Sequence, residues 1–471
     1  MTVPHRQQPA WRRWIDFFRE SLKDSDTDFT KGPIGRALGL LAIPMMLEMS
    51  MEAIFAVVDI AFVSRLGTDA VAAVGITEAL LTVLYAVAIG LGMGVTAMVS
   101  RRYGAGDPGA GAKVTGQAIW IGALLALIIG VVGVNFAADL LRMMGAGPSV
   151  VETGTGFTAV LLGGSASILF LFLLNAAFRG AGDATVALRS LALANAVNIF
   201  LDPCLIFGLG PFPELGVTGA AVATTIGRSI GVLYLFWYLF TDRGRLRVTP
   251  RHLQIDPPLI RRLIRISIGG IGQFLISVSS WIAIVRIVAI YGSGPIAAYT
   301  IALRLIEFAI LPAWGLGNAA ATLVGQNLGA GQPARAERSA WTAAKANVVF
   351  MAVLGGLMLV FAPIIMKWFT QDPEVLRYGT SCLRILGIGY PIYAAGMIMI
   401  QALNGAGDTR TPSLMNLVCF WMIQIPLAYW LATAVGLGPN GVFASIVLSE
   451  SLLTVMAIRV FRSGRWQTQV A

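Results

Sequence analysis

The chain has few charged residues for its length, and it almost lacks cysteine and histidine. Charged side chains make up 12% of its 471 residues, whereas 56% are hydrophobic. A soluble globular chain carries about 25% charged residues, so this composition excludes a soluble fold and indicates a membrane protein. The three cysteines lie far apart in apolar segments, which argues against a disulfide framework or a thiolate metal site. The two histidines lie in polar segments, so no histidine is expected to relay protons within the membrane.

Long apolar segments recur through the whole chain, and each is long enough to cross a hydrocarbon core, which takes about 20 helical residues. They lie at 36–62, 70–98, 114–136, 155–178, 186–209, 216–240, 262–290, 296–326, 340–366, 378–403, 412–436 and 441–461. The sequence therefore predicts an all-α integral membrane protein with twelve transmembrane helices in two six-helix bundles. Because an even number of spans gives both halves the same orientation, their pseudo-two-fold axis should run along the membrane normal.

Three short motifs recur in the chain at a single spacing. Gly180 of one motif returns as Gly405, which is 225 residues later (405 − 180). The three pairs of segments are 178–183 with 403–408, 103–108 with 328–333, and 71–75 with 296–300. One offset shared by three separate motifs indicates that the chain contains two copies of one unit.

The repeat and the polar segments suggest a division of the chain. We expect a cytoplasmic N-terminal segment at 1–33, an N-lobe at 34–240, a cytoplasmic linker at 241–261, a C-lobe at 262–462 and a cytoplasmic tail at 463–471. The first segment lacks the apolar core of a cleavable signal peptide. Its aromatic residues alternate with charges between Trp11 and Arg19, which favours a short amphipathic helix in the membrane interface over a disordered tail.

The formal net charge of +10 is distributed unevenly across the membrane. With the N-terminus placed inside, about 26 of the 34 Lys and Arg fall on the cytoplasmic side. This positive-inside bias explains the basic composition without a nucleic-acid partner. It predicts a multi-pass protein of the inner or plasma membrane with both termini in the cytoplasm.

Acidic side chains are rare within the apolar spans, and two of them stand out. Asp59 lies in the first span and Asp202 in the fifth, four residues after Asn198 and on the same helix face. An ionisable group in the membrane is costly, so a function is the default hypothesis. Two carboxyls and an amide suit a hard monovalent cation or a shared proton. Pro44 and Pro203 each leave a helical carbonyl without its donor, which suggests hinges. The alternative is that Asp59 caps a helix and Asp202 is a solvated loop residue.

The two halves differ at these acids. At the repeat spacing, Asp59 corresponds to Ile284 and Asp202 to Leu427. A carboxylate that the fold of the repeat required would be expected in both halves. The asymmetry therefore favours a functional role.

For four further charged residues the sequence does not decide between alternative partners or surroundings. Arg228 and Glu450 occupy matching positions in the sixth and twelfth spans, where they either pair across the lobes or find local partners. Glu48 and Glu52 lie in the first span and face either a cavity or the interfacial region.

The beginning of the first span, Ile43–Ser50, with Val58–Ile60 and Leu66–Gly67 after it, resembles the multidrug and toxic compound extrusion (MATE) family. The two Gly-Ala-Gly-Asp segments and Gly219–Thr224 agree with it, so the resemblance covers essentially the whole chain. It implies two six-helix lobes that export cationic or amphipathic compounds in exchange for inward H⁺ or Na⁺, without another cofactor.

Within that family the chain is similar to the DinF-like branch. This similarity implies an N-lobe cation or proton site formed by Asp59, Asn198, Asp202 and Thr224, with Pro44 as the bending proline. The NorM-like branch uses acids in the seventh and tenth spans, and these spans contain no acid here. As substrate-cavity residues we expect Gln273, Trp281, Tyr393 and Gln401.

Two other functions are compatible with the sequence. A lipid-linked or polysaccharide flippase of the same superfamily would share the architecture but needs a cationic cavity. An intramembrane aspartyl protease is suggested by Gly180–Asp183, which matches a Gly-x-Gly-Asp signature, although no second acid that would share its proton is evident. The expected partners are therefore small-molecule substrates and the bilayer, and the expected oligomeric state is a monomer.

Overall fold

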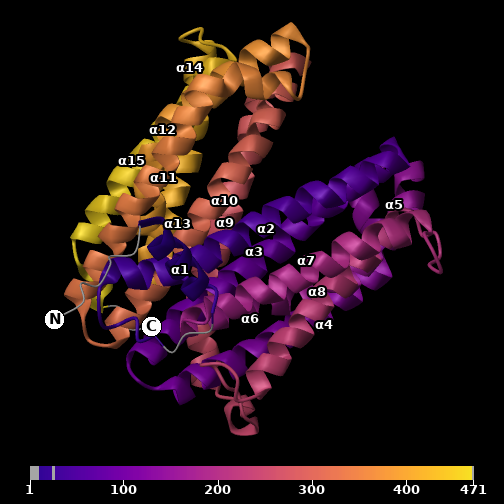
Figure 1. Cartoon of the computed structure of the whole chain (residues 1–471). Coiled ribbons are helices and arrows are strands. Elements are labelled where there is room, and N and C mark those ends of the chain that lie inside the picture. The colour runs from indigo at the N-terminus through magenta and orange to yellow at the C-terminus, as the bar shows by residue number, and fades with distance from the viewer. Residues whose placement is uncertain (1–9, 24–26, 469–471) are drawn as a thin grey trace, which may run out of the picture.

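The computed structural model describes residues 10–23 and 27–468, and in these ranges it is built of helices (Figure 1). The twelve spans are α2 (Ile34–Val63), α3 (Thr68–Gly104), α4 (Pro108–Met143), α5 with α6 (Pro148–Gly163 and Ser165–Ala181), α7 (Ala184–Phe207), α8 (Val217–Phe240), α9 (Pro257–Ala289), α10 (Ser293–Gly329), α11 (Pro333–Lys367), α12 (Pro373–Gly405), α13 with α14 (Arg410–Asn416 and Ile425–Thr433) and α15 (Pro439–Arg462). This arrangement confirms the predicted all-α membrane fold.

Two spans depart from a straight α-helix. The fourth bends by 41° between α5 and α6, where the adjacent Gly163 and Gly164 weaken the helix. The eleventh contains a π-helical stretch, Leu417–Gln424, which ends two residues before Pro426. A proline removes a helical hydrogen bond, and a wider turn relieves the resulting clash with the preceding carbonyl.

The first six spans form the N-lobe and the last six the C-lobe, and Figure 1 shows the two lobes diverging like the arms of a V. They meet at the end where α2 begins and α15 ends, which we call the closed end. We call the opposite end the open end. Helix α2 packs against both α7 and α10, and α3 packs against both α6 and α9. Helices α2 and α3 therefore form the N-lobe side of the lobe boundary.

The lobes touch at the closed end through glycines that the repeat relates to each other. A Cβ on Gly104 of α3 would lie 1.8 Å from the carbonyl oxygen of Gln326 on α10. A Cβ on Gly329 of α10 would lie 2.0 Å from the carbonyl oxygen of Arg101 on α3. Gly104 and Gly329 differ by the repeat spacing (329 − 104), so the contact follows the pseudo-two-fold symmetry. Only glycine permits this close backbone approach.

The hydrogen bonds across the closed end are reciprocal as well. Arg101 donates from Nη1 to the carbonyl of Ala406 in the C-lobe at 3.3 Å. Its repeat counterpart, Gln326, donates from Nε2 to the carbonyl of Gly180 in the N-lobe at 3.0 Å. The Gly-Ala-Gly segments of the sequence are turns at the ends of helices, and they also form the junction between the lobes.

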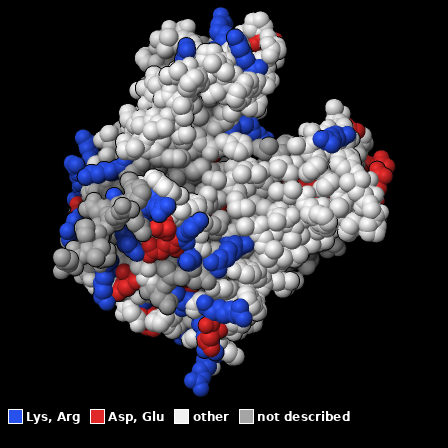
Figure 2. All heavy atoms as spheres, in the orientation of Figure 1, with Lys and Arg blue, Asp and Glu red and all other residues white. Residues whose placement is uncertain are grey.

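Amphipathic α1 (Ala10–Ser21) lies at the closed end. Its place in the membrane interface stays a prediction. Trp11, Trp14 and Phe18 are exposed on it. On the face shown in Figure 2, Lys and Arg gather around this end and at the tips of the lobes, whereas the flanks of the helices are nearly free of charge. This distribution is that of a protein whose flanks face lipid.

Candidate cation site and central cavity

A buried polar cluster connects α7 and α8 inside the N-lobe. Asn198 donates from Nδ2 to Asp202 Oδ1 at 3.2 Å and to Thr224 Oγ1 at 3.1 Å. Asp202 is fully buried, with 0% of its surface exposed, so it is not a solvated loop residue. Gly227 lets α8 approach α7 closely, because a Cβ there would meet the carbonyl oxygen of Ala194 at 2.6 Å. This close packing brings Thr224 to the α7 pair.

Asp59 adds a second carboxyl from α2, the helix that packs against α7. It lies within α2, not at its end, and is near enough to Asp202 for the two carboxylates to repel each other. One oxygen each of Asp59, Asn198 and Asp202 is buried without a hydrogen-bond partner among the described residues. Such atoms are costly to bury unpaired. Hard cations prefer oxygen ligands of this kind, and a proton on either acid would likewise reduce the repulsion.

The two predicted hinge prolines lie inside these helices. Pro44 is in α2 and Pro203 in α7, and both helices continue through their proline. Next to Pro44, Gly315 of α10 approaches α2 so closely that a Cβ would lie 2.5 Å from the carbonyl oxygen of Met45. The weakened point of α2 thus coincides with its contact to the C-lobe. The hinge role itself stays a prediction.

Arg228 pairs within the N-lobe and not with Glu450 of the C-lobe, so of the two alternatives the local partner is correct. Its Nη1 donates to the hydroxyl of Tyr85 at 2.9 Å, and its Nη2 lies 3.6 Å from Glu52 Oε1. The guanidinium also stacks on Phe55 at 5.4 Å from the ring centroid. Arg228 therefore ties α8 to α2 and α3 near the polar cluster of Asn198, Asp202 and Thr224.

Sequence reasoning missed a second ion pair, Arg179–Glu48. The Arg179 Nη1 to Glu48 Oε1 distance is 2.5 Å, and Asn175 Nδ2 also donates to Glu48 Oε1 at 3.4 Å. Glu48 is only 1% exposed, so it needs such a partner. The sequence contains one indication that Arg179 has a specific role. At the repeat spacing (404 − 179) it corresponds to the neutral Asn404, so the two halves differ here as they do at Asp59.

A cavity of about 450 Å³ lies between the lobes, and its wall is mainly apolar. Both ion pairs contribute to this wall. Glu48 and Arg179 line it directly, and so do Glu52 and Tyr85, the two partners of Arg228. The C-lobe contributes Phe274, Trp281, Trp314, Asn318 and Gln401. Of the four residues predicted for this cavity, Trp281 and Gln401 line it. Gln273 is half-buried in α9, and its Oε1 has no partner among the described residues.

Tyr393 lies in a smaller C-lobe cavity of about 80 Å³, which Trp281 also lines. Glu450 shares this cavity with Tyr390, Tyr393 and Gln424. The Glu450 Oε2 atom is buried without a hydrogen-bond partner among the described residues. Trp281 therefore lines both cavities, whereas Tyr393 lines the C-lobe cavity and not the central one.

The Gly-x-Gly-Asp aspartates are structural. Asp183 is buried at the start of α7 and accepts the backbone N–H of Arg245 at 2.7 Å. Asp408 accepts the backbone N–H of Thr411 at 3.2 Å and its hydroxyl at 2.7 Å. Because the two aspartates satisfy turns in equivalent places of separate lobes, neither has the arrangement of an acid pair that shares one proton.

Comparisons of the sequence and of the structure with known proteins identify the same family of transporters. The sequence model of the MatE family matches residues 44–204 and 270–430. The chain is 28% identical over 408 residues to the probable multidrug resistance protein YoeA of Bacillus subtilis, which covers 86% of this chain and 88% of that protein. It is 27% identical over 398 residues to the FAD transporter of Shewanella oneidensis, with 84% and 88% covered. A solved outward-facing MATE multidrug resistance transporter superposes with a TM-score of 0.88 at 26% identity, over 94% of this chain and 98% of that one.

Proposed function

Since the chain belongs to the MatE family of membrane transporters, we propose that it exports cationic or amphipathic small molecules in exchange for H⁺ or Na⁺. The observation that carries this proposal is the group of three buried, unpartnered oxygens on Asp59, Asn198 and Asp202. The names of relatives such as the multidrug export protein MepA support drug-like substrates. Members of this family are transporters and not enzymes, which agrees with the structural role of Asp183.

The proposed coupling runs through α2. This helix contributes Asp59 to the cation cluster and packs against α7 in the N-lobe and α10 in the C-lobe. An ion that binds between Asp59 and Asp202 removes their repulsion, which changes the preferred position of α2 at the lobe boundary. The closed end lies in the cytoplasm in this proposal, so the cavity faces outward and the ion loads from outside. Reorientation of the lobes then carries the ion inward.

The cavity wall favours cationic over strongly anionic substrates. Its two acids, Glu48 and Glu52, are each matched by an arginine, Arg179 and Arg228, so the wall holds no excess of cationic charge. A flippase for pyrophosphate-linked lipids would need unpaired cations there. Trp281 and Trp314 offer flat surfaces for aromatic or cationic groups. The aromatic, mainly apolar wall therefore supports the drug-like substrate class. The inner or plasma membrane and a monomeric state belong to the same proposal.

The test is direct ion binding to the purified protein without substrate. Radiolabelled Na⁺ binding is measured from pH 5 to 8 for the wild type, Asp202→Asn and the control Asp139→Asn, whose carboxyl is exposed and paired with Arg142. We expect Asp202→Asn to lose Na⁺ binding and ion-driven dye export, and Asp139→Asn to keep both. Proton release on Na⁺ addition would show competition at one site. If Asp202→Asn exports dye at the wild-type rate under either ion gradient, the proposed coupling is wrong.

A further inference from the structure

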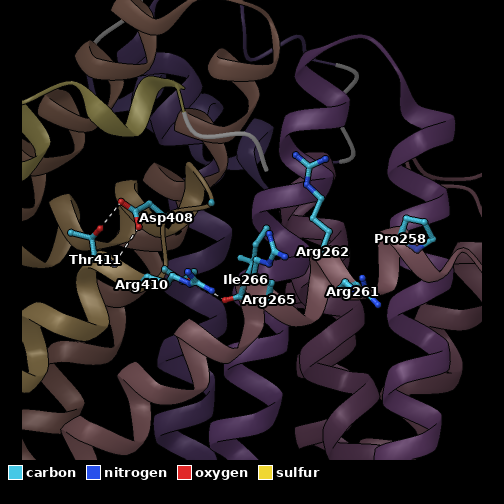
Figure 3. A pocket seen from close by; sticks show the side chains of 10 residues that line it. Pro258, Arg261, Arg262, Arg265, Ile266, Asp408, Arg410 and Thr411 are labelled. Atoms are coloured by element: carbon cyan, nitrogen blue, oxygen red, sulfur yellow. Dashed lines mark hydrogen bonds between the residues drawn. The ribbon is translucent and has the colours of Figure 1, made fainter.

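A basic pocket lies at the closed end of the C-lobe, outside the central cavity. It occupies about 630 Å³ between the first turns of α9 and the α12–α13 turn (Figure 3). Arg261, Arg262 and Arg265 come from α9, and Arg410 from the start of α13. Figure 3 shows Arg410 beside Arg265, with Asp408 and Thr411 hydrogen-bonded to each other next to them. Four arginines thus line one pocket, and Asp408 is the only acid among the described residues that line it.

These arginines lack counter-ions. Within residues 10–23 and 27–468, none of the four forms an ion pair. The Nη2 of Arg262 is buried without any hydrogen-bond partner in the same ranges. Arg102 of α3 is close enough to repel Arg262, which in turn repels Arg101. An unpaired guanidinium is a strong ligand for phosphate, so the cluster is suited to an anion.

An apolar groove of about 560 Å³ adjoins the pocket and shares Arg261, Arg265 and Arg410 with it. Its other walls include Ile264, Ile268 and Leu414, which are exposed. The groove has a rigid edge, because Thr409 Oγ1 donates to the carbonyl of Ile266 at 2.6 Å and Ser413 Oγ to that of Gly269 at 2.6 Å. Gly272 leaves the groove open, since a Cβ there would meet nothing within 4 Å. A charged head region is therefore continuous with a groove that fits an acyl chain.

The N-lobe provides an internal comparison, because there the chain covers the equivalent surface itself. The repeat places Ala37, Leu40 and Thr185 at the positions of Arg262, Arg265 and Arg410. On that surface the Phe17 ring of α1 reaches within 2.6 Å of where a Cβ on Gly39 would lie, and Leu40 is only 5% exposed. Glu20 of α1 pairs with Arg36, the counterpart of Arg261, at 2.5 Å. The N-lobe thus has both an apolar cover and an acid for its arginine.

The C-lobe has no such cover from the segment that precedes α9. This segment turns toward the N-lobe, where Gln117 of α4 donates to the carbonyl of Gln254 at 2.9 Å. Trp120 of α4 donates to the carbonyl of Leu253 at 2.8 Å. The segment is thereby held against α4. Among the described residues, the segment before α9 therefore supplies no counterpart of the apolar, anion-bearing cover that α1 gives the N-lobe, and the pocket and groove are left open.

We propose that this pocket and groove bind one anionic phospholipid of the surrounding leaflet, with its phosphate among Arg262, Arg265 and Arg410 and an acyl chain along Ile268 and Leu414. Basic pockets between helices at the membrane surface are a known form of lipid recognition. The site adjoins the junction between the lobes, since Gly407 of the pocket follows Ala406, the acceptor of Arg101. The bound phosphate neutralises the repulsion among Arg101, Arg102 and Arg262. The lipid therefore stabilises the closed end.

The test compares lipid retention by three forms of the full-length protein. Wild type, Arg262→Gln/Arg265→Gln/Arg410→Gln and the control Arg251→Gln/Arg338→Gln/Arg459→Gln are titrated with dioleoylphosphatidylglycerol or dioleoylphosphatidylcholine and examined by native mass spectrometry. The control removes three exposed arginines from the same end of the molecule. We expect the pocket variant to lose about 100-fold in phosphatidylglycerol affinity, because each arginine near an anionic lipid headgroup contributes about fivefold and the variant removes three. Equal loss in the control variant, or no loss in the pocket variant, overturns the proposal.

Two further measurements distinguish binding of a lipid from binding of a free anion. In the first, retention of soluble glycerol phosphate also serves as the control for correct folding of the variant. Gly272→Phe adds a ring to the groove and leaves all four arginines in the sequence, so we expect it to weaken binding of phosphatidylglycerol several-fold while leaving retention of soluble glycerol phosphate unchanged. Inorganic phosphate at millimolar concentration should not displace the lipid from wild type. Displacement by phosphate would show a site for soluble anions. Full lipid affinity in Gly272→Phe would show that no acyl chain lies in the groove. Either outcome overturns the assignment of one phospholipid to the pocket and groove.

Discussion

Gly104→Ala tests whether the glycine contact at the closed end controls the conformational equilibrium. The added Cβ would lie 1.8 Å from the carbonyl oxygen of Gln326, whereas ordinary contacts begin at 3.4 Å. Helices α3 and α10 must therefore separate by about 1.6 Å (3.4 − 1.8). Overpacking of this kind costs about 1–3 kcal/mol. Because only conformations in which the lobes meet at this end contain the contact, the cost shifts the population about 5- to 150-fold away from them.

The assay follows the accessibility of the central cavity from the closed end. Asn318→Cys, which lines the cavity, is introduced into a protein whose three native cysteines are replaced, and labelling by a membrane-impermeant maleimide is measured from each side. Gly104→Ala should increase labelling through the closed end and reduce it through the open end. Gly75→Ala on the same helix is the matched control, because its Cβ would meet nothing within 4 Å. If Gly104→Ala folds and labels as Gly75→Ala does, the contact does not determine which end is closed.

Two further predictions concern stability. Arg228→Met leaves Glu52 and Tyr85 without their cationic partner in the N-lobe interior. Loss of one member of such a pair costs about 3 kcal/mol, so the apparent Tm in detergent should fall, and Glu52→Gln should restore part of it in the double variant. An unchanged Tm in Arg228→Met would contradict this. Hydrogen bonds from Thr30 and Lys31 lower the pKa of Asp28 to about 2. The stability from Asp28 is therefore present above pH 4 and lost as the pH falls toward 2. Asp28→Asn should flatten the Tm–pH profile in this range, and an equally steep profile would refute the assignment.

Much of the architecture was predictable, because the physical causes are local. Hydrocarbon thickness sets the length of an apolar span, so the twelve segments and their even division follow from hydropathy. The constant spacing between Gly180 and Gly405 and their neighbours revealed the duplication. Asn198 and Asp202 could be assigned to one face because they are four residues apart on a helix.

The partners of these residues could not be predicted, because they come from other helices. Whether Arg228 meets Glu52 or Glu450, and whether Tyr393 faces the central cavity, depends on how each helix is rotated and where it crosses its neighbours. The helical periodicity of the sequence does not determine the rotation of each helix or the point where it crosses its neighbours. The same holds for Arg179 and Glu48, which are 131 residues apart and meet only because α6 packs inside the N-lobe.

The sequence by itself determined that this protein spans the membrane twelve times in two related halves, and that Asp59 and Asp202 have no acidic counterparts in the second half. Those properties follow from hydropathy, spacing and the identity of single residues. The tertiary structure decided that Asn198 reaches Thr224 on the neighbouring helix, that the lobes meet through Gly104 and Gly329, and that four arginines of the C-lobe line one pocket. These depend on helix crossing, because a side chain's electrostatic surroundings are set by whichever neighbour the packing brings within a few ångströms.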